Sequence, residues 1–246
     1  MIALFTDFGR SGPYQGLLQN AIYKVAPETT VIDLMADAPA YDAESAGCLL
    51  AALSKDFAPG TVFLGVVDPG VGGSRKPCIV SANGHWFVGP DNGLFDVVAS
   101  QDESARWWCI TWQPESLSHT FHGRDLFAPV AAYLEQDVSS LSRLAEHEYS
   151  KSLSVPGNAY CIIYIDDYGN LFTGIQAASI SSDSVLELQG ISISHAQIFS
   201  DVGLGQAFWF ENAFGLIEIA VNSASAAKHF GVEIGTVVNE ISTISS

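Results

Sequence analysis

The first third of the chain alternates between short apolar segments and helical periodicities, and this alternation restricts the fold more than any other feature. The segments 2–6, 31–34 and 61–67 are apolar and too short for buried helices. Between them, apolar residues recur every three or four positions in 17–25 and 46–53. Strand, helix, strand, helix and strand in this order predict an α/β domain with parallel strands.

Acidic residues directly follow two of these strands. Asp7 follows the first strand and Asp68 the third, and the carboxyl ends of parallel strands share one edge of a sheet, so we expect the two side chains to converge. After Asp68, Pro69 and three glycines form an open loop, and Arg75 lies near enough to fold back. The alternative is a structural turn in which Asp68 caps its own backbone. Asp33, near the same edge, is expected to bond only locally.

The segment after this loop brings in a different strand direction and a histidine. Asn83-Gly84 between two apolar segments is typical of a β-hairpin, which makes the sheet mixed. Further along, His122 precedes a helical periodicity, so a ligand at that helix end would meet a titratable imidazole. We predict no metal at His119 and His122, because a pair without a third ligand is weak evidence.

A change in composition indicates two domains. A polar stretch that ends in Pro-Gly predicts a linker at about 148–157. Residues 1–147 are then predicted to form a three-layer α/β domain with a mostly parallel sheet. Residues 158–246 contain short apolar segments separated by turn signals and only one helical stretch, which predicts a small antiparallel β-barrel.

The second predicted domain contains one tight turn with polar side chains, at 166–170. Asn170 in this turn offers one donor and one acceptor, the pair that an adenine edge requires. The alternative is that Asn and Asp stand here for purely conformational reasons, as they often do in turns.

Composition narrows the partners and the compartment. A formal charge of −17 with only 10 Lys and Arg argues against a nucleic-acid partner. No apolar segment reaches membrane-spanning length, and the first residues lack the basic flank of a signal peptide, so we expect a cytoplasmic protein without a membrane partner. The cysteines stand singly in apolar surroundings, which predicts buried free thiols. They are Cys48, Cys78, Cys109 and Cys161.

Five motifs, in this order and spacing, resemble those of the S-adenosyl-L-methionine (SAM) hydroxide adenosyltransferases, which are relatives of the fluorinating and chlorinating enzymes. The resemblance covers nearly the whole chain. The motifs are Thr-Asp-Phe-Gly at 6–9, Val-Asp-Pro-Gly-Val-Gly at 67–72 with Arg75, Pro-Asp-Asn-Gly at 90–93, Phe-His-Gly-Arg-Asp at 121–125, and Asp-Asp-Tyr-Gly-Asn at 166–170.

The resemblance implies hydrolysis of SAM to adenosine and L-methionine, with water or hydroxide attacking C5′ of the ribose. SAM is then the substrate, and no cofactor or metal is implied. The family's catalytic triad falls on Asp68, Arg75 and His122. The resemblance also implies a homotrimer whose active sites lie at subunit interfaces.

The resemblance implies a set of substrate-binding residues as well. Asp7 matches the carboxylate for the ribose diol, Asn170 the adenine contact, and Asp166 the partner of the methionine end. Two positions depart from the family pattern: Ala213 replaces a small polar residue, and Phe214 stands where halogenating relatives carry Arg. The other positions, which flank the ribose and adenine or form the C-terminal wall, are Tyr41, Phe199, Asn212 and Val221.

Two other functions are weighed against hydrolysis. One is a non-catalytic protein that binds adenosine or SAM, which would give the Asp68, Arg75 and His122 triad no task. The other is a SAM-dependent halogenase. The halogenating relatives carry a Tyr and a small hydroxyl residue where this chain has Asp68 and Gly123, and a carboxylate repels halide. A phosphate-binding enzyme is less favoured, because the loop at 70–74 lacks the Gly-x-x-x-x-Gly-Lys-Ser/Thr pattern.

Overall fold

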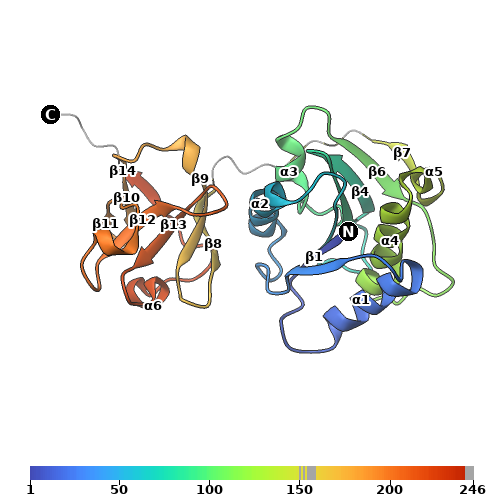
Figure 1. The fold of residues 1–246 in the computed structure, drawn as a ribbon, viewed down its shortest axis with the longest axis horizontal. Coiled ribbons are helices and arrows are strands. Elements are labelled where there is room, and N and C mark those ends of the chain that lie inside the picture. Colours follow the sequence, from blue (N-terminus) through green and yellow to red (C-terminus); the bar gives the residue numbers. More distant parts are fainter. Residues whose placement is uncertain (150, 152, 154–158, 242–246) are drawn as a thin grey trace. The chain divides into compact units, whose positions relative to one another are not determined.

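The protein consists of two compact units, residues 1–155 and 156–246, in a computed structural model that describes residues 1–149, 151, 153 and 159–241 (Figure 1). Much of the predicted linker, at 150, 152 and 154–157, lies outside the described residues. In the described part of the chain, no helix is both long and apolar enough to span a membrane.

The first unit is built on a seven-stranded sheet with the strand order β2-β1-β3-β5-β4-β6-β7. The predicted parallel strands β2, β1 and β3 are neighbours, and β5 pairs in parallel with β3. The strands are β1 (Ile2–Thr6), β2 (Val31–Met35), β3 (Val62–Val66), β4 (Pro77–Ala82), β5 (His85–Pro90), β6 (Arg106–Ile110) and β7 (Ala145–Glu148).

The sheet is mixed rather than mostly parallel. Beyond β5, the pairs β5–β4, β4–β6 and β6–β7 are all antiparallel. The cause is the predicted hairpin: Asn83 and Gly84 both have positive φ, 52° and 77°, which is the two-residue turn that reverses a strand. A parallel return would need a crossover of a dozen residues or more.

Helices cover both faces of this sheet, as predicted (Figure 1). Ile2 and Leu4 of β1 pack with Leu18 and Ile22 of α1 on one face, where α4 also lies. The second and third helices lie on the other face, and Asp42 caps the start of α2 by accepting a hydrogen bond from the Ser45 N–H. The helices are α1 (Tyr14–Val25), α2 (Ala43–Leu53), α3 (Asp96–Ser100), α4 (Ala128–Gln136) and α5 (Leu141–Leu144).

The second unit contains two antiparallel sheets, with strand orders β12-β13-β9-β8 and β11-β10-β14. A helix, α6 (Ala226–Phe230), packs against β13, and Ile217, Ile219 and Val221 of β13 lie in the core of the unit. The strands are β8 (Ala159–Ile165), β9 (Leu171–Gln176), β10 (Val185–Leu188), β11 (Ile191–Ile193), β12 (Ala207–Glu211), β13 (Leu216–Val221) and β14 (Asn239–Ile241).

The antiparallel strands of the second unit were predicted, but the described residues do not form the predicted closed barrel. Only isolated bridges stand between the two sheets or at their margins, Cys161 with Val237 and His195 with Trp209. Short strands of three or four residues, such as β10, β11 and β14, offer too few ladder bonds to continue one sheet into the next.

Two facing glycines let β3 and β5 approach each other beneath the ring of Phe95. A Cβ atom on Gly89 would lie 2.1 Å from the carbonyl oxygen of Gly65 and 2.9 Å from the Phe95 ring. A Cβ atom on Gly65 would lie 2.8 Å from the same ring. Because Asp68 lies two residues beyond the end of β3, this close approach also fixes the strand end from which Asp68 emerges.

The Gly89→Ala substitution is expected to lower the free energy of unfolding by about 2–3 kcal/mol, because backbone and a buried ring must move to admit one methyl group. The matched control is Gly16→Ala in α1, where nothing lies within 4 Å, and it is expected to raise the free energy of unfolding by up to about 1 kcal/mol. Urea unfolding of both variants measures the difference. Equal effects would contradict the packing described for Gly89.

Candidate active site

Asp7 leaves the carboxyl end of β1 at a half-buried position. Its Oδ2 accepts a hydrogen bond from the backbone N–H of Tyr41 at 3.2 Å. Burial raises the pKa of Asp7, the N–H of Tyr41 opposes this rise, and the charge of Asp68 adds to it. Tyr41 itself has a positive φ of 62° and a side chain that is 80% exposed. The two predicted substrate-binding residues are thus in direct contact.

Asp68 and Arg75 form a buried, two-pronged ion pair across the glycine-rich loop. Nε of Arg75 lies 3.0 Å from each carboxylate oxygen of Asp68, and Nη2 lies 2.6 Å from Oδ2. Their side chains are only 4% and 10% exposed. The Arg75 guanidinium also lies over the ring of Phe127, at 5.3 Å from its centroid. Arg75 therefore folds back onto Asp68, as predicted.

The same guanidinium reaches His122. Nη2 of Arg75 lies 2.8 Å from Nδ1 of His122. Because an arginine nitrogen only donates, Nδ1 must be the acceptor, and the imidazole is neutral with its proton on Nε2. Burial first, and then the positive charge of Arg75, lower the pKa of His122, while Asp68 opposes the shift. The charge on Arg75 thus sets the tautomer of the histidine.

The loop that carries Asp68 and Arg75 is packed against the segment that carries His122. Gly72 has a φ of 76°, and a Cβ atom there would lie 2.4 Å from the carbonyl oxygen of His119. His122 stands at the start of a single π-helical turn, Gly123–Phe127, that continues into α4. Such turns are often found at functional sites. The close backbone contact at Gly72 holds the two segments in register.

These residues surround one small cavity in the first unit. Its volume is about 130 Å³, and Asp7, Tyr41, Asp68 and His122 all line it. The apolar part of the lining includes Phe8, Val66, Pro69, Val71 and Phe121. The expected convergence of Asp7 and Asp68 at the edge of the sheet is confirmed. Asp33 instead accepts a hydrogen bond from the side chain of Gln15 at 2.7 Å and does not line the cavity.

The motif at 90–93 supports the end of β3, a role that sequence reasoning did not assign. Nδ2 of Asn92 donates to the carbonyl oxygen of Val67 at 2.8 Å, directly before Asp68. Oδ1 of the same side chain accepts from the N–H of Leu94 at 3.3 Å. The Asn92 amide therefore ties the backbone beside Asp68 to the start of the next turn. In the sequence, the signal for this role was the Pro-Asp-Asn-Gly motif at 90–93.

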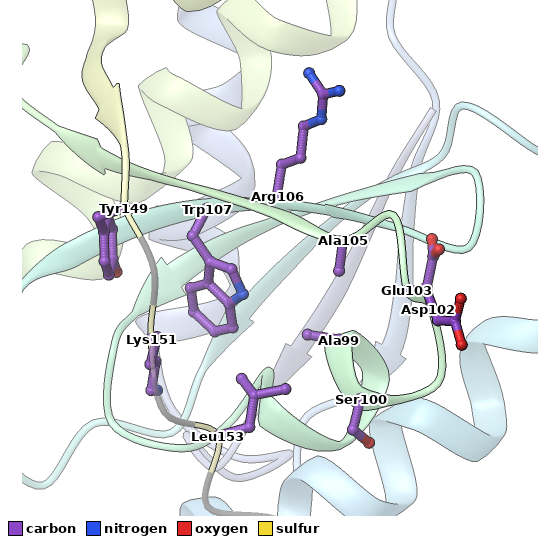
Figure 2. A pocket seen from close by; sticks show the side chains of 10 residues that line it. All are labelled: Ala99, Ser100, Asp102, Glu103, Ala105, Arg106, Trp107, Tyr149, Lys151 and Leu153. Carbon is purple, nitrogen blue, oxygen red and sulfur yellow. The ribbon is translucent and has the colours of Figure 1, made fainter.

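A second cavity in the first unit lies near β6, with a volume of about 580 Å³ (Figure 2). Trp107 faces it, while the neighbouring Arg106 side chain points away from that of Trp107. The Lys151 ammonium lies 4.7 Å from the Trp107 centroid and forms ion pairs with Asp91 and Asp96, at 2.5 and 2.6 Å. Within the described residues, none of the predicted site residues lines this cavity. Its lysine anchors the segment after β7.

The turn at 166–170 in the second unit holds its own residues tightly. Asp166 accepts hydrogen bonds from the backbone N–H groups of Tyr168 and Asn170 at 3.0 and 2.8 Å, and from Nδ2 of Asn170 at 3.2 Å. Asn170, Phe199 and Val221 line a cavity of about 540 Å³. Three predicted substrate-binding residues are thus brought together, and Asp166 supports one of them.

The predicted C-terminal wall is the turn between β12 and β13. Oδ1 of Asn212 accepts from the N–H groups of Phe214 and Leu216, each at 3.0 Å, so this side chain closes the turn. Phe214 stacks on Phe172 with the ring centroids 6.3 Å apart, and Ala213 is exposed. None of the three lines the cavity that contains Asn170.

A buried acid, Glu218, stands beside these residues and was missed by sequence reasoning. Its carboxyl group is buried on β13 and accepts a hydrogen bond from Nδ2 of Asn212 at 3.3 Å. Burial raises the pKa of Glu218 to about 7, hydrogen bonds from Asn212 and Asn170 oppose the rise, and the charge of Asp166 adds to it. The available signal was an acidic residue inside the apolar segment 216–221.

No group of three or more His, Cys, Asp or Glu side chains in the described residues is arranged to hold a metal ion. His119 and His122 are not part of any such group among the described residues. The four cysteines form no disulfide. Cys48 and Cys78 are buried, as predicted, whereas Cys109 and Cys161 are only partly buried.

Comparison with known proteins identifies the family to which the two units are similar. Residues 2–145 match the SAM hydroxide adenosyltransferase N-terminal domain, and residues 160–239 match the C-terminal domain of the same family. A relative from Thermus thermophilus named (R)-S-adenosyl-L-methionine hydrolase is 31% identical, over 95% of this chain and 96% of its own. A fluorinase from Nocardia brasiliensis is 22% identical over 96% of this chain and 94% of its own.

A solved structure has the same fold. An uncharacterized conserved protein from Thermotoga maritima superposes with a TM-score of 0.87 at 30% identity, covering 98% of this chain and 99% of that chain. Together the two domain matches span nearly the entire chain. They include the residues that line the two cavities. The chain belongs to the SAM hydroxide adenosyltransferase family.

Proposed function

We propose that this protein hydrolyses SAM to adenosine and L-methionine by attack of water or hydroxide on ribose C5′. The observation that carries the proposal is the double contact of Arg75, with the Asp68 carboxylate and with Nδ1 of His122, beside a cavity that Asp68 and His122 line. A relative that is 31% identical over 95% of this chain is named (R)-S-adenosyl-L-methionine hydrolase.

The geometry suggests separate tasks for the two groups that face the cavity. Arg75 occupies Nδ1 of His122, so the remaining ring nitrogen, Nε2, carries a hydrogen and can donate to the oxygen of the attacking water. Oδ2 of Asp68 accepts two hydrogen bonds from Arg75, whereas Oδ1 accepts one and keeps a further lone pair that can accept the proton of that water. Together they orient the attacking water. Displacement also requires that C5′ be aligned with this water.

The leaving side of the reaction needs little help from the protein. Attack at C5′ breaks the bond to a positively charged sulfur, and methionine departs as a neutral thioether. No general acid and no cofactor is required on that side, and SAM serves only as the substrate. A positioned base contributes about 10²–10⁴-fold in rate, so alignment of water and C5′ supplies much of the remainder.

We propose that the other predicted residues bind the substrate. Asp7, which faces the same cavity as Asp68, holds the ribose diol, with Tyr41 beside it. In the second unit, Asn170 contacts adenine, and Phe199 and Val221 flank it. Asp166 and the wall at Asn212, Ala213 and Phe214 are assigned to the methionine end, where Ala213 offers no side-chain donor and Phe214 offers a ring.

We also propose a cytoplasmic location. The support is that the four cysteines form no disulfide, because secreted proteins of this size commonly oxidise theirs to disulfides.

Purified protein is expected to convert SAM into equal amounts of adenosine and methionine. The Asp68→Asn and His122→Ala substitutions are each expected to lower kcat by about 10²–10⁴-fold, because one removes the acceptor for the water proton and the other removes the Nε2 donor. Chromatography of the products after incubation with each sulfonium epimer of SAM measures both, since the Thermus relative is named for the (R) form.

The matched control is Asp33→Asn, which changes a carboxylate bonded to Gln15 away from the cavity and is expected to leave kcat unchanged. Tight binding of SAM or adenosine by calorimetry without any product would instead support the non-catalytic binding protein. A halogenated nucleoside that forms only with added chloride or fluoride would support the halogenase. Either result would overturn the hydrolase proposal.

The pH profile is expected to have an acidic limb below pH 6.5. Burial and Arg75 lower the pKa of His122, so the imidazole stays neutral at and above its ordinary pKa and becomes protonated only at lower pH. Protonation removes the acceptor at Nδ1 and places a cation against Arg75, so kcat/KM falls there. Rates from pH 5 to 9, with circular dichroism as a check on folding, test this. An acidic limb at pH 7 or above would contradict it.

We propose further that the active protein is a homotrimer with its active sites at subunit interfaces, as the family resemblance implies. The support is a set of exposed large side chains at the two cavities. Tyr41, at the first cavity, is 80% exposed, and Tyr168 and Phe199, at the cavity of the second unit, are 83% and 41% exposed. Exposed aromatic side chains of this kind are enriched at interfaces.

Light scattering is expected to give a mass of three times the 26.2 kDa chain. If the sites lie between subunits, dilution that dissociates the trimer lowers the activity per chain in parallel with the trimer fraction. A monomer that retains full activity per chain at every concentration would show the interface proposal to be wrong.

A further inference from the structure

Glu218 occupies an unusual place in the four-stranded sheet of the second unit. Its strand neighbours Ile217 and Ile219 point into the core, so Glu218 lies on the opposite face of the sheet. There it is paired across the strands with Phe210 of β12 and Phe172 of β9. The residue is only 6% exposed. A carboxyl group between two aromatic neighbours is costly to bury and must be held by hydrogen bonds.

The groups that hold Glu218 are two predicted substrate-binding amides. Nδ2 of Asn212 donates to Oε2 at 3.3 Å, and the side chain of Asn170 is also a hydrogen-bonding neighbour. Asp166 lies close enough for its charge to act on Glu218. Glu218 therefore connects the turn at 166–170 to the turn between β12 and β13.

The contacts of Asn170 define which way its amide is turned. The NH₂ group donates to Oδ2 of Asp166 at 3.2 Å, and Glu218 is its second carboxyl neighbour. An amide nitrogen only donates and the Asp166 carboxylate accepts, so the bond to Asp166 directs the NH₂ group at the acids, and ionised Glu218 accepts its second hydrogen. The remaining polar atom of the side chain is Oδ1, which only accepts. Asn170 is 9% exposed and lines the cavity with Phe199 and Val221.

We propose that Glu218 is a positioning residue that, with Asp166, holds the NH₂ group of Asn170 so that Oδ1 serves the cavity as an acceptor. An acceptor at this position selects a ligand that presents a hydrogen-bond donor. It therefore favours an amino-purine over an oxo-purine. The inference rests on the proposed function, because it concerns the nucleoside half of that substrate. Glu218 itself touches Asn170 and not the ligand.

The test compares adenosine, which carries an amino group at purine C6, with inosine, which carries a carbonyl oxygen there. Calorimetry on the full chain measures both dissociation constants for the wild-type protein and for Glu218→Gln. In the variant, the glutamine oxygen engages Asn212 and its NH₂ group faces Asn170, which favours the reversed Asn170 amide. The preference for adenosine over inosine is expected to fall at least about tenfold, equivalent to 1.4 kcal/mol.

Steady-state kinetics adds a readout that a purely structural role would not give. KM for SAM is expected to rise by about tenfold in Glu218→Gln, with kcat changed less than about threefold, because Asp68, Arg75 and His122 are untouched. The matched control is Glu233→Gln, an exposed glutamate of the same unit, which is expected to change neither KM nor the preference. Glu218→Ala, which removes the carboxyl group without adding a donor, is expected to cause a smaller loss of preference.

An unchanged adenosine preference in both Glu218 variants would overturn the proposal. So would equal weakening of adenosine and inosine, since that indicates loss of packing alone. If Glu218→Gln fails to fold, the preference of Glu218→Ala decides. A wild-type protein that prefers adenosine but never turns over SAM would refute the hydrolase proposal and leave this inference standing.

Discussion

The candidate active site depends on one guanidinium group. Arg75 binds both oxygens of Asp68, which lies in the same loop, and the Nδ1 atom of His122, which comes from a segment far along the chain. Removing one partner from a buried pair of this kind typically costs about 3–5 kcal/mol, because the other charge is left without compensation. Arg75 therefore does more than neutralise Asp68. It also determines which nitrogen of His122 carries the proton, and so which atom faces the cavity as a donor.

The fold supplies that arrangement through backbone contacts that exclude side chains. Gly65 and Gly89 let β3 and β5 approach under Phe95, and Gly72 lets the loop after Asp68 rest on the backbone of His119. Asn92 then ties the carbonyl of Val67 to the following turn. These contacts place Asp68, Arg75 and His122 in register without a disulfide or a metal ion among the described residues. The glycine-rich sequence around the site is thus a packing requirement as well as a route for ligand approach.

The surroundings of the buried acids Asp68 and Glu218 differ between the two units. Asp68 is paired with an arginine and faces a cavity, which suits a group that must accept a proton. Glu218 has amides and a neighbouring carboxylate around it instead of a cation, and burial raises its pKa to about 7. A group so placed is suited to orienting its neighbours through hydrogen bonds. In the proposed mechanism, Asp68 acts on the attacking water, whereas Glu218 holds its neighbours in position.

The sequence by itself determined the first three strands and the helices between them, the positions of Asp7 and Asp68 beyond the ends of parallel strands, and the return of Arg75, because periodicity and turn residues act locally. The family resemblance added His122, which no local pattern connects to Asp68. Only the tertiary structure decided that the sheet is half antiparallel, that the second unit has two separate sheets, and that Glu218 lies beside Asn170. Pairing between distant strands and the environment of a buried acid depend on contacts across the fold, which spacing along the chain does not specify.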